Sequence, residues 1–112
     1  MTYYQQGDLV FLNFPFDDTA VSKPRPCIIV GDKPSRFGAY IVAKITSNPR
    51  SDAHSFWLDN SELSSPTPRP SQVRVNDIHT VNGATILHRF SFLSRNALKL
   101  LCEQVKTNFE VA

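Results

Sequence analysis

The apolar segments of this chain are short, and a proline, a glycine or a polar loop separates each from the next. Segments of this length that are rich in valine, isoleucine and aromatic residues are typical of β-strands. The expected strands are residues 9–14, 26–30, 40–45, 55–58, 72–75, 78–81 and 85–90. Many short strands with turn-rich links predict a mainly β fold, either a small β-barrel or a strongly curved sheet.

Asn82-Gly83 is the strongest short hairpin signal in the chain, because these residue types tolerate the positive φ angles of a type I′ turn. It lies between the strands expected at 78–81 and 85–90. We therefore expect these two strands to form an antiparallel hairpin.

The end of the chain has the period of an amphipathic helix, and Ser94 is a suitable N-cap for it. Leu100 and Cys102 widen its apolar face. The residues that define this face are Ala97, Leu98, Leu101, Val105 and Phe109. The sequence therefore predicts one helix packed on the β structure, which makes the fold α+β by count of elements.

The length and composition suit one compact domain over residues 1–112. Hydrophobic residues make up 41% of the chain and include eight phenylalanines, which is enough for a core. We find no apolar run long enough to cross a bilayer, and the first residues lack the basic and apolar regions of a signal peptide. We expect no membrane association and a cytoplasmic location.

Charge and cysteine content leave the function open. A net charge of +2 permits a nucleic-acid partner without requiring one, since the charges do not fall in blocks. Cys27 and Cys102 form neither a disulfide framework nor a metal motif, and we expect both to be small buried residues. His54, His79 and His88 lack the spacing of a metal set, so no metal or other cofactor is expected.

Arg25 stands between two prolines at the start of the strand expected at 26–30. Proline fixes its own φ and disfavours helix in the residue before it, so the backbone at Arg25 should be stiff and extended. An arginine on such a backbone segment loses little backbone entropy when it binds an anion, and its planar guanidinium fits phosphate. Arg25 is therefore the first candidate for an anion-binding side chain.

Thr46 and Ser47 follow an expected strand, and Arg74 faces away from the valines on either side of it. Taken singly, an arginine after a loop is a solvated charge, and Thr-Ser after a strand caps a turn. Strand ends in a small barrel converge on one rim, so these residues could share a site with Arg25. Two guanidiniums and two hydroxyls suit phosphate oxygens and do not suit a metal ion.

Six short motifs follow one another along nearly the whole chain. They are Gly7-Asp8-Leu9-Val10, Phe14-Pro15-Phe16, Lys23-Pro24-Arg25-Pro26, Ile45-Thr46-Ser47, Ser71-Gln72-Val73-Arg74-Val75 and, before a helix, Phe92-Leu93-Ser94. In this order they resemble the MazF/PemK toxins of type II toxin–antitoxin systems. The most specific pair is the Arg-Pro that leads into a buried strand and the Thr-Ser that follows the next strand.

The resemblance implies an SH3-like β-barrel of the MazF/PemK/CcdB kind that works as a homodimer. It also implies a metal-independent endoribonuclease that cleaves single-stranded RNA by attack of the 2′-hydroxyl and leaves a 2′,3′-cyclic phosphate and a 5′-hydroxyl. A cognate antitoxin would lay an acidic segment across the same groove. The central arginine and threonine of the family fall on Arg25 and Thr46.

In that chemistry Arg25 would stabilise the negative charge of the phosphorane, with Thr46 donating a hydrogen bond beside it. Arg74 would hold a neighbouring phosphate or assist the 5′-oxygen leaving group. Phe16 would stack on a base, although packing in the core is an equal alternative for it. Besides the catalytic residues, the residues expected to contact RNA are Phe16, Lys23, Ser47, Asn76 and His79.

Asn76 departs from the aspartate that some PemK-type members carry two residues after the arginine equivalent to Arg74. An amide cannot take up the 2′-hydroxyl proton as a base. Asp77 comes one place later, on the opposite pleat of a regular strand. The general base is therefore His79, Asp77 or absent.

Two alternative functions stay open. One is a catalytically inactive family member that binds RNA or a protein partner. The reason for this alternative is Asn76, which stands where some members carry the aspartate proposed as the base. The other is a CcdB-like gyrase poison with the same barrel. Those poisons end in Trp-Gly-Ile, whereas this chain ends in Asn108-Phe109-Glu110-Val111-Ala112, which argues against this alternative.

Overall fold

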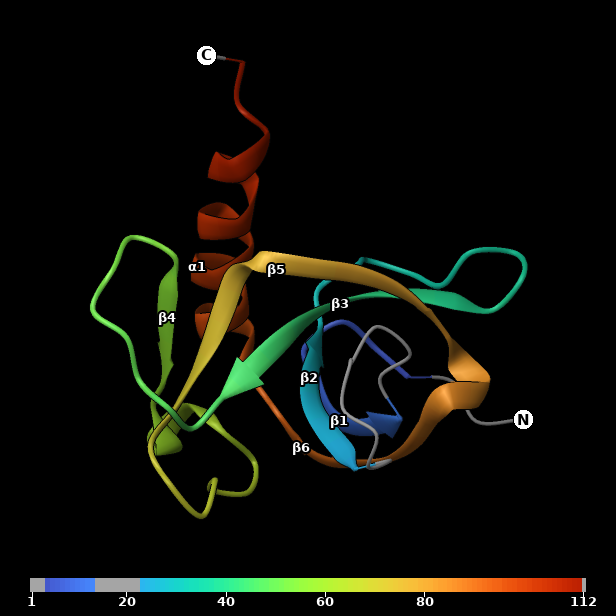
Figure 1. The fold of residues 1–112 in the computed structure, drawn as a ribbon, viewed down its shortest axis with the longest axis horizontal. Coiled ribbons are helices and arrows are strands. Elements are labelled where there is room, and N and C mark those ends of the chain that lie inside the picture. Colours follow the sequence, from blue (N-terminus) through green and yellow to red (C-terminus); the bar gives the residue numbers. More distant parts are fainter. Residues whose placement is uncertain (1–3, 14–22, 112) are drawn as a thin grey trace.

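The computed structural model describes residues 4–13 and 23–111 of the chain. In this part short strands dominate and one α-helix follows them, which confirms the mainly β fold predicted from the sequence (Figure 1). The elements are β1 (Asp8–Asn13), β2 (Pro24–Ile29), β3 (Ala39–Thr46), β4 (Ser55–Leu58), η1 (Asn60–Glu62), β5 (Ser71–Asn82), η2 (Gly83–Thr85), β6 (Ile86–Phe92), α1 (Arg95–Lys106) and η3 (Thr107–Phe109). None of the helices in the described ranges has the length and apolar character needed to span a membrane.

The strands form one antiparallel sheet with the order β4-β5-β3-β2-β1-β6. Figure 1 shows this sheet strongly curved, with β5 arching along the top of the view and β6 along the bottom. Between the described residues, no ladder joins the outer strands β4 and β6; an isolated bridge between Leu63 and Leu93 links the segments that follow them. The strongly curved sheet is therefore what the structure supports, and the closed barrel predicted from the sequence is not confirmed.

β5 is one continuous strand, whereas the sequence predicted two strands at 72–75 and 78–81. Its pairing with β3 is irregular, because Ala43 lies opposite Ile78 and Ile45 lies opposite Val73. Two steps along β3 thus correspond to five steps along β5. Extra residues in one strand bend it and increase its twist, and Figure 1 shows β5 bending along its length.

The predicted hairpin at Asn82-Gly83 is wrong, since β5 pairs with β3 and β4 while β6 pairs with β1. The Asn82 side chain accepts the backbone N–H of Ala84 at 2.9 Å and caps the short helix η2. Gly83 does not adopt a positive φ, which a type I′ turn requires. The capped helix therefore carries the chain from one part of the sheet to another.

The predicted hairpin would have placed His79 and His88 on neighbouring strands, but the structure places them on strands that do not pair with each other. His79 lies opposite Val42 of β3, and His88 lies opposite Phe11 of β1. Within the described residues, no group of three or more histidine, cysteine, aspartate or glutamate side chains is arranged to hold a metal ion.

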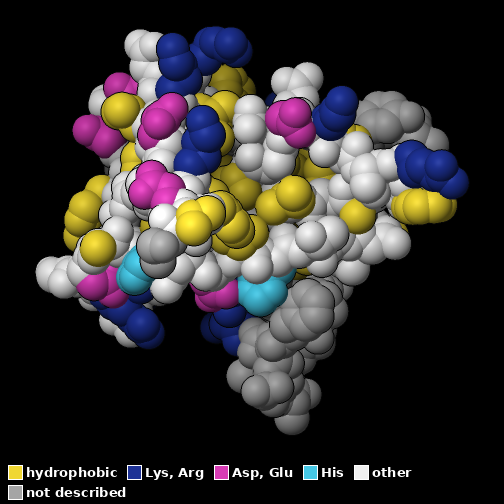
Figure 2. Space-filling model, turned by 90° about the horizontal axis from the view of Figure 1, so that it is seen from above, with side chains coloured by type: hydrophobic (Ala, Val, Ile, Leu, Met, Phe, Trp, Pro, Cys, Tyr) yellow, Lys and Arg dark blue, Asp and Glu magenta, His cyan; other side chains and the backbone are white. Residues whose placement is uncertain are grey.

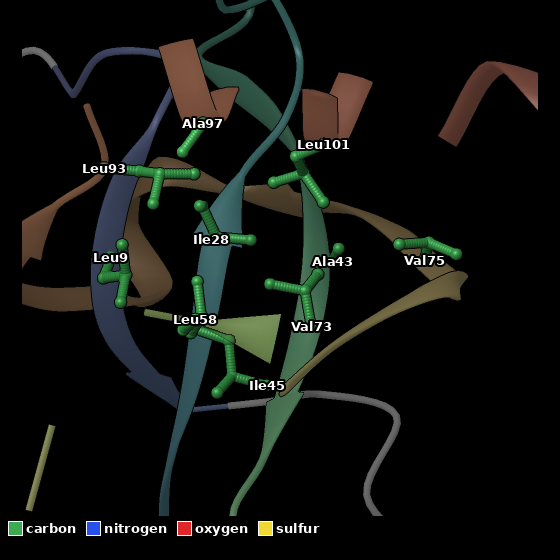
Figure 3. Close-up of a cluster of buried hydrophobic side chains, with 10 residues drawn as sticks. All are labelled: Leu9, Ile28, Ala43, Ile45, Leu58, Val73, Val75, Leu93, Ala97 and Leu101. Carbon is green, nitrogen blue, oxygen red and sulfur yellow. The ribbon is translucent and has the colours of Figure 1, made fainter. Parts of the chain in front are cut away.

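Both faces of the sheet are covered by apolar side chains. Leu9 of β1 belongs to the core that includes α1, whereas its neighbour Val10 belongs to a second core on the opposite face. Figure 3 shows the first core, in which Ala97 and Leu101 of α1 lie over side chains from the sheet. Burial on both faces explains why β1 is apolar at almost every position.

α1 begins at the predicted N-cap, because the Ser94 hydroxyl oxygen accepts the backbone N–H of Ala97 at 3.2 Å. The predicted apolar face is correct for Ala97 and Leu101, which are buried. It is wrong for Phe109 and Leu100, whose side chains are 72% and 66% exposed. Phe109 lies in η3, beyond the α-helical period, and Leu100 is one helical step of about 100° away from Leu101. Figure 2, which views the molecule from the side toward which α1 ends, shows hydrophobic side chains exposed among charged ones.

The two cysteines differ in burial. Cys27 is buried as predicted, and burial raises the pKa of its thiol to about 12. Cys102 is half-buried, and its Sγ accepts a hydrogen bond from Gln6 Nε2 at 3.6 Å. The prediction of a buried residue is therefore correct for Cys27 and wrong for Cys102.

Candidate functional site

A cavity of about 630 Å³ lies where the first residues of β2 and the last residues of β3 separate. β2 pairs with β3 only from Cys27 onward, and the end of β3, Ile45 and Thr46, pairs with β5 instead. Figure 1 shows the end of β3 turning away from the start of β2. The curvature of the sheet thus opens a space between two neighbouring strands.

Five of the site residues predicted from the sequence line this cavity. They are Lys23, Arg25, Thr46, Ser47 and Arg74. The antiparallel pairing of β2 and β3 places the start of one strand beside the end of the other, and β5 borders the end of β3. Residues far apart in the chain therefore meet at one place. Phe16, which was also predicted to contact a ligand, lies outside the described residues.

Arg25 is half-buried on β2, opposite Leu12 of β1. The prolines on both sides of it also pair with β1. Proline has no N–H to donate to a second neighbouring strand, so this end of β2 bonds to β1 and turns its other edge to the cavity. The extended backbone predicted at Arg25 is confirmed, because Arg25 lies within β2.

The described lining of the cavity is strongly cationic. Its one carboxylate is that of Asp77, and its lysine and arginine side chains are Lys23, Arg25, Lys44, Arg50 and Arg74. Such a cluster attracts a polyanion and repels a divalent cation.

Lys44 and Arg50 are lining residues that the sequence analysis missed. Lys44 is the one charged residue in the apolar segment 40–45, which was a usable signal. Arg50 gave no signal of its own, because it lies in a polar loop after Pro49.

The Arg74 guanidinium is bound to a carboxylate. Its two terminal nitrogens lie 3.0 and 2.9 Å from the two oxygens of Asp52, and one of them also donates to the Ser55 hydroxyl at 2.8 Å. These hydrogen bonds raise the pKa of Arg74 and hold the pKa of Asp52 well below its usual range. The partner of Arg74 in this structure is therefore an anion from the same chain.

The loop that carries Asp52, between β3 and β4, is fixed by side chains outside it. Gln72 is fully buried; its Oε1 accepts the Arg50 N–H at 3.0 Å, and its Nε2 donates to the Arg50 carbonyl at 2.8 Å. Gln104 of α1 donates to the carbonyls of Ala53 and Ser55, both at 3.1 Å. The backbone of Arg50, whose side chain lines the cavity, is thus held in place by two hydrogen bonds to Gln72.

Thr46 Oγ1 accepts the backbone N–H of Asn48 at 3.0 Å. This hydrogen bond fixes the orientation of the side chain and leaves the hydroxyl proton to be donated elsewhere. Thr46 is thereby prepared as a donor at the edge of the cavity.

In a regular strand Asn76 would lie on the same face as Arg74 and Asp77 on the opposite face. The structure has Asp77 at the cavity and Asn76 away from it. Asn76 is exposed and is not among the described residues that line the cavity, whereas Asp77 lines it together with Arg74. The irregular pairing of β5 between Val73 and Ile78 breaks the alternation that put Asp77 on the opposite pleat. The predicted contact through Asn76 is therefore not supported.

His79 reaches the site through Asp77. Its Nε2 lies 2.6 Å from Asp77 Oδ1, and the side chain is partly exposed. His79 itself is not in the described lining of the cavity. The pair still places an imidazole directly behind the one carboxylate of that lining.

Replacing Asp52 with asparagine is expected to lower the stability of the fold at neutral pH and to lower it much less in strong acid. Asp52 has a depressed pKa in the folded protein, so its stabilising contribution is complete above the usual value of about 3.9. It is lost progressively as the pH falls from that value through the lower pKa of the folded state. The effect is modest, since the ion pair is accessible to water.

Urea unfolding midpoints of the wild type and Asp52→Asn, compared at about pH 7 and about pH 2, measure this difference. The matched control is Asp32→Asn, which changes an exposed carboxylate in the loop between β2 and β3 and should leave the midpoint unchanged. An equal gap between wild type and Asp52→Asn at both pH values would contradict the assignment.

The family model described as "PemK-like, MazF-like toxin of type II toxin-antitoxin system" matches residues 5–109 of the chain. A comparison with curated proteins finds no match.

Several solved structures share the fold. An endoribonuclease from mycobacterial species has a TM-score of 0.76 and 12% sequence identity, over 97% of this chain and 93% of that chain. An endoribonuclease in complex with its cognate antitoxin, also from mycobacterial species, has a TM-score of 0.75 and 11% identity over 97% of each chain. A MazE–MazF structure from Deinococcus radiodurans has a TM-score of 0.74 and 13% identity over 100% of each chain. At such low identities, the likeness is one of fold.

Proposed function

Because this chain belongs to the PemK-like, MazF-like family of type II toxin–antitoxin toxins, we propose that it is an endoribonuclease toxin that cleaves single-stranded RNA. The observation that carries the proposal is the cationic cavity in which Arg25, Thr46 and Ser47 line the same space. The fold that it shares with an endoribonuclease and with an endoribonuclease–antitoxin complex from mycobacterial species supports it.

The nucleophile in the proposed reaction is the 2′-hydroxyl of the RNA itself. Its oxygen bonds to the adjacent phosphorus, the bond from phosphorus to the 5′-oxygen breaks, and the departing 5′-oxygen takes up a proton from water. The ends are a 2′,3′-cyclic phosphate and a 5′-hydroxyl. The phosphorane between them carries extra negative charge. Donors fixed in place before the reaction stabilise that charge more than they stabilise the substrate.

Arg25 is the main donor in this proposal, because its planar fork sits on a rigid strand start and can bond two phosphate oxygens. Thr46 and Ser47 donate hydroxyl hydrogen bonds beside it, and Lys23 binds a neighbouring phosphate. Guanidinium, ammonium and hydroxyl groups supply all of this stabilisation, so the proposed reaction uses no metal ion or other cofactor.

Arg74 has a narrower part here than the one expected from the sequence. Its raised pKa makes it a poor proton donor to the 5′-oxygen, and its fork is bonded to Asp52. We assign Arg74 to holding the loop between β3 and β4 in place and to adding fixed positive charge beside the phosphate.

Asp77 is the general base in this proposal. It is the carboxylate in the described lining, and His79 binds its Oδ1, which leaves Oδ2 to take up the 2′-hydroxyl proton. His79 acts by orienting Asp77, and Asn76 takes no part in the proton transfer.

The proposal extends to partners and assembly. A cognate antitoxin with an acidic segment would fit the same cationic cavity by charge, and a homodimer is expected from the family. We also propose that residues 1–112 form one domain, that the protein is cytoplasmic and that it has no membrane partner. The strongly curved sheet supports an SH3-like barrel, and an experimental structure that resolves the strand ladders would test it.

Incubation of the purified protein with a long single-stranded RNA in excess EDTA tests the activity. The expected result is fragments with cyclic-phosphate and 5′-hydroxyl ends, at the same rate with and without EDTA. Binding without cleavage across several diverse RNAs would instead favour the inactive family member. Inhibition of gyrase with intact RNA would favour the gyrase poison.

A further inference from the structure

A smaller hollow of about 220 Å³ adjoins the cationic cavity. The two spaces share four lining residues, which are Phe11, Pro26, Ile45 and Ser47. The far side of the smaller hollow is formed by Phe90 of β6 and by residues 67–71, called the loop 67–71 here, which end with the first residue of β5. The two hollows are therefore direct neighbours, and an RNA strand with a phosphate in the cationic cavity passes beside the smaller hollow.

The wall of the smaller hollow is largely apolar and aromatic. The Phe11 and Phe90 rings are both half-buried, with centroids 4.4 Å apart and an interplanar angle of 30°. Two proline rings and Ile45 complete the apolar lining. This surface is unsuited to a second phosphate and suited to a flat, uncharged ring that can stack on a phenyl group.

The loop at the rim carries both donors and acceptors. Thr67 Oγ1 donates to the Arg69 carbonyl at 2.7 Å, and Ser71 Oγ donates to the same carbonyl at 3.0 Å. Because their protons are used in this way, the two hydroxyl oxygens offer lone pairs to a ligand. The Arg69 side chain offers only donors. The edges of nucleobases present both kinds of group.

We propose that the smaller hollow binds one unpaired nucleobase of the RNA strand whose phosphate occupies the cationic cavity. Its volume is below the range of about 300–1,000 Å³ that drug-sized ligands fill, which fits a single base and not a longer stretch of chain. Phe11 and Phe90 provide the stacking surface, and Arg69 contacts the base edge. The inference rests on the proposed function, and it makes Arg69 a residue that determines base preference beside the cut.

Cleavage of a randomised single-stranded RNA library, with sequencing of the new ends, tests this assignment. Arg69→Ala is expected to relax the base preference at one position next to the cut and to leave the preference elsewhere unchanged. Phe90→Leu keeps an apolar side chain and removes the ring, so cleavage at limiting RNA should slow by roughly fivefold to a hundredfold. Thermal unfolding of both variants checks that they fold.

The matched control is Arg36→Ala. Arg36 is an exposed arginine stacked on Phe37 in the loop between β2 and β3, at the other end of these strands from the cavity. It should change neither rate nor base preference. If Arg69→Ala and Phe90→Leu cut with the wild-type rate and the wild-type preference, the base site is disproved while the proposed function stands.

Photocrosslinking separates the base site from catalysis. Uncleavable 2′-O-methyl RNA that carries 4-thiouridine and 6-thioguanosine is irradiated with the wild-type protein, and the adducts are mapped by mass spectrometry. Adducts on Phe11, Phe90 or the loop 67–71 support the base site, even if no RNA is cleaved in the library experiment. Adducts confined to other surfaces, or no adducts, overturn it.

Discussion

Replacing Arg25 with alanine is expected to lower the rate of RNA cleavage by about two to three orders of magnitude, the usual cost of removing one preorganised donor to a developing oxyanion. The half-buried guanidinium lies on a β2 segment that bonds to β1, with its edge turned to a cavity lined by cations. No other donor in the described lining combines a planar fork with a backbone held by two prolines. Its loss should therefore affect the transition state more than it affects RNA binding.

Single-turnover cleavage rates and thermal unfolding midpoints, measured side by side, check this expectation. The midpoint should stay close to that of the wild type, because Arg25 lies at the start of a strand and outside both hydrophobic cores. Arg36→Ala, which removes an arginine from the loop between β2 and β3, should cleave at the wild-type rate. Equal cleavage by Arg25→Ala and Arg36→Ala would remove Arg25 from the site.

Replacing Asp77 with asparagine is expected to lower the cleavage rate by about 10²–10⁴-fold, the range that general base catalysis contributes. The substitution keeps the size of the side chain and removes its ability to take up the 2′-hydroxyl proton. Asp77 lines the cavity with Arg74, and His79 contacts its Oδ1 at 2.6 Å. RNA binding should be retained, since the change removes a negative charge from a site for phosphate.

Asn76→Ala is the matched control for that experiment. Asn76 precedes Asp77 in the chain and is exposed outside the described lining, so its truncation should leave the single-turnover rate near that of the wild type. A large loss of rate in Asn76→Ala together with wild-type activity in Asp77→Asn would show that the base assignment is wrong. Loss in neither variant would remove Asp77 as the base and would leave His79, or a reaction without a protein base.

Local sequence rules were sufficient for part of the site and the helix start. Arg25 and Thr46 were predicted from their places at a strand start and a strand end, and antiparallel pairing of β2 with β3 brings such ends together. Ser94 was predicted as an N-cap, a feature set by a few neighbouring residues. The meeting of Arg25 and Thr46 in one cavity and the helix start at Ser94 both depend on the backbone within a few residues and on simple strand pairing, which is why local rules were enough for them.

Other features depend on tertiary register, which local patterns do not contain. The irregular pairing of β5 with β3 exchanges the expected positions of Asn76 and Asp77, and it is set by contacts between distant strands. The ion pair between Arg74 and Asp52 joins residues on different elements. Asn82-Gly83 matches a hairpin turn by composition, but the Asn82 side chain caps a short helix and β6 pairs with β1. Local sequence patterns therefore could not predict the β5 register, the Arg74–Asp52 ion pair or the helix at Asn82-Gly83.

A single substitution in the RNA tests the central claim, which is that the cationic cavity promotes attack by the RNA's own 2′-hydroxyl. Once a cut site is mapped, an RNA with a 2′-deoxy nucleotide on the 5′ side of that bond is compared with the all-ribose RNA in EDTA. We predict that the substituted bond stays intact while binding of the RNA is retained and other sites are still cut. Cleavage of the substituted bond at the normal rate would contradict the account, since no 2′-oxygen is present there to form the cyclic phosphate.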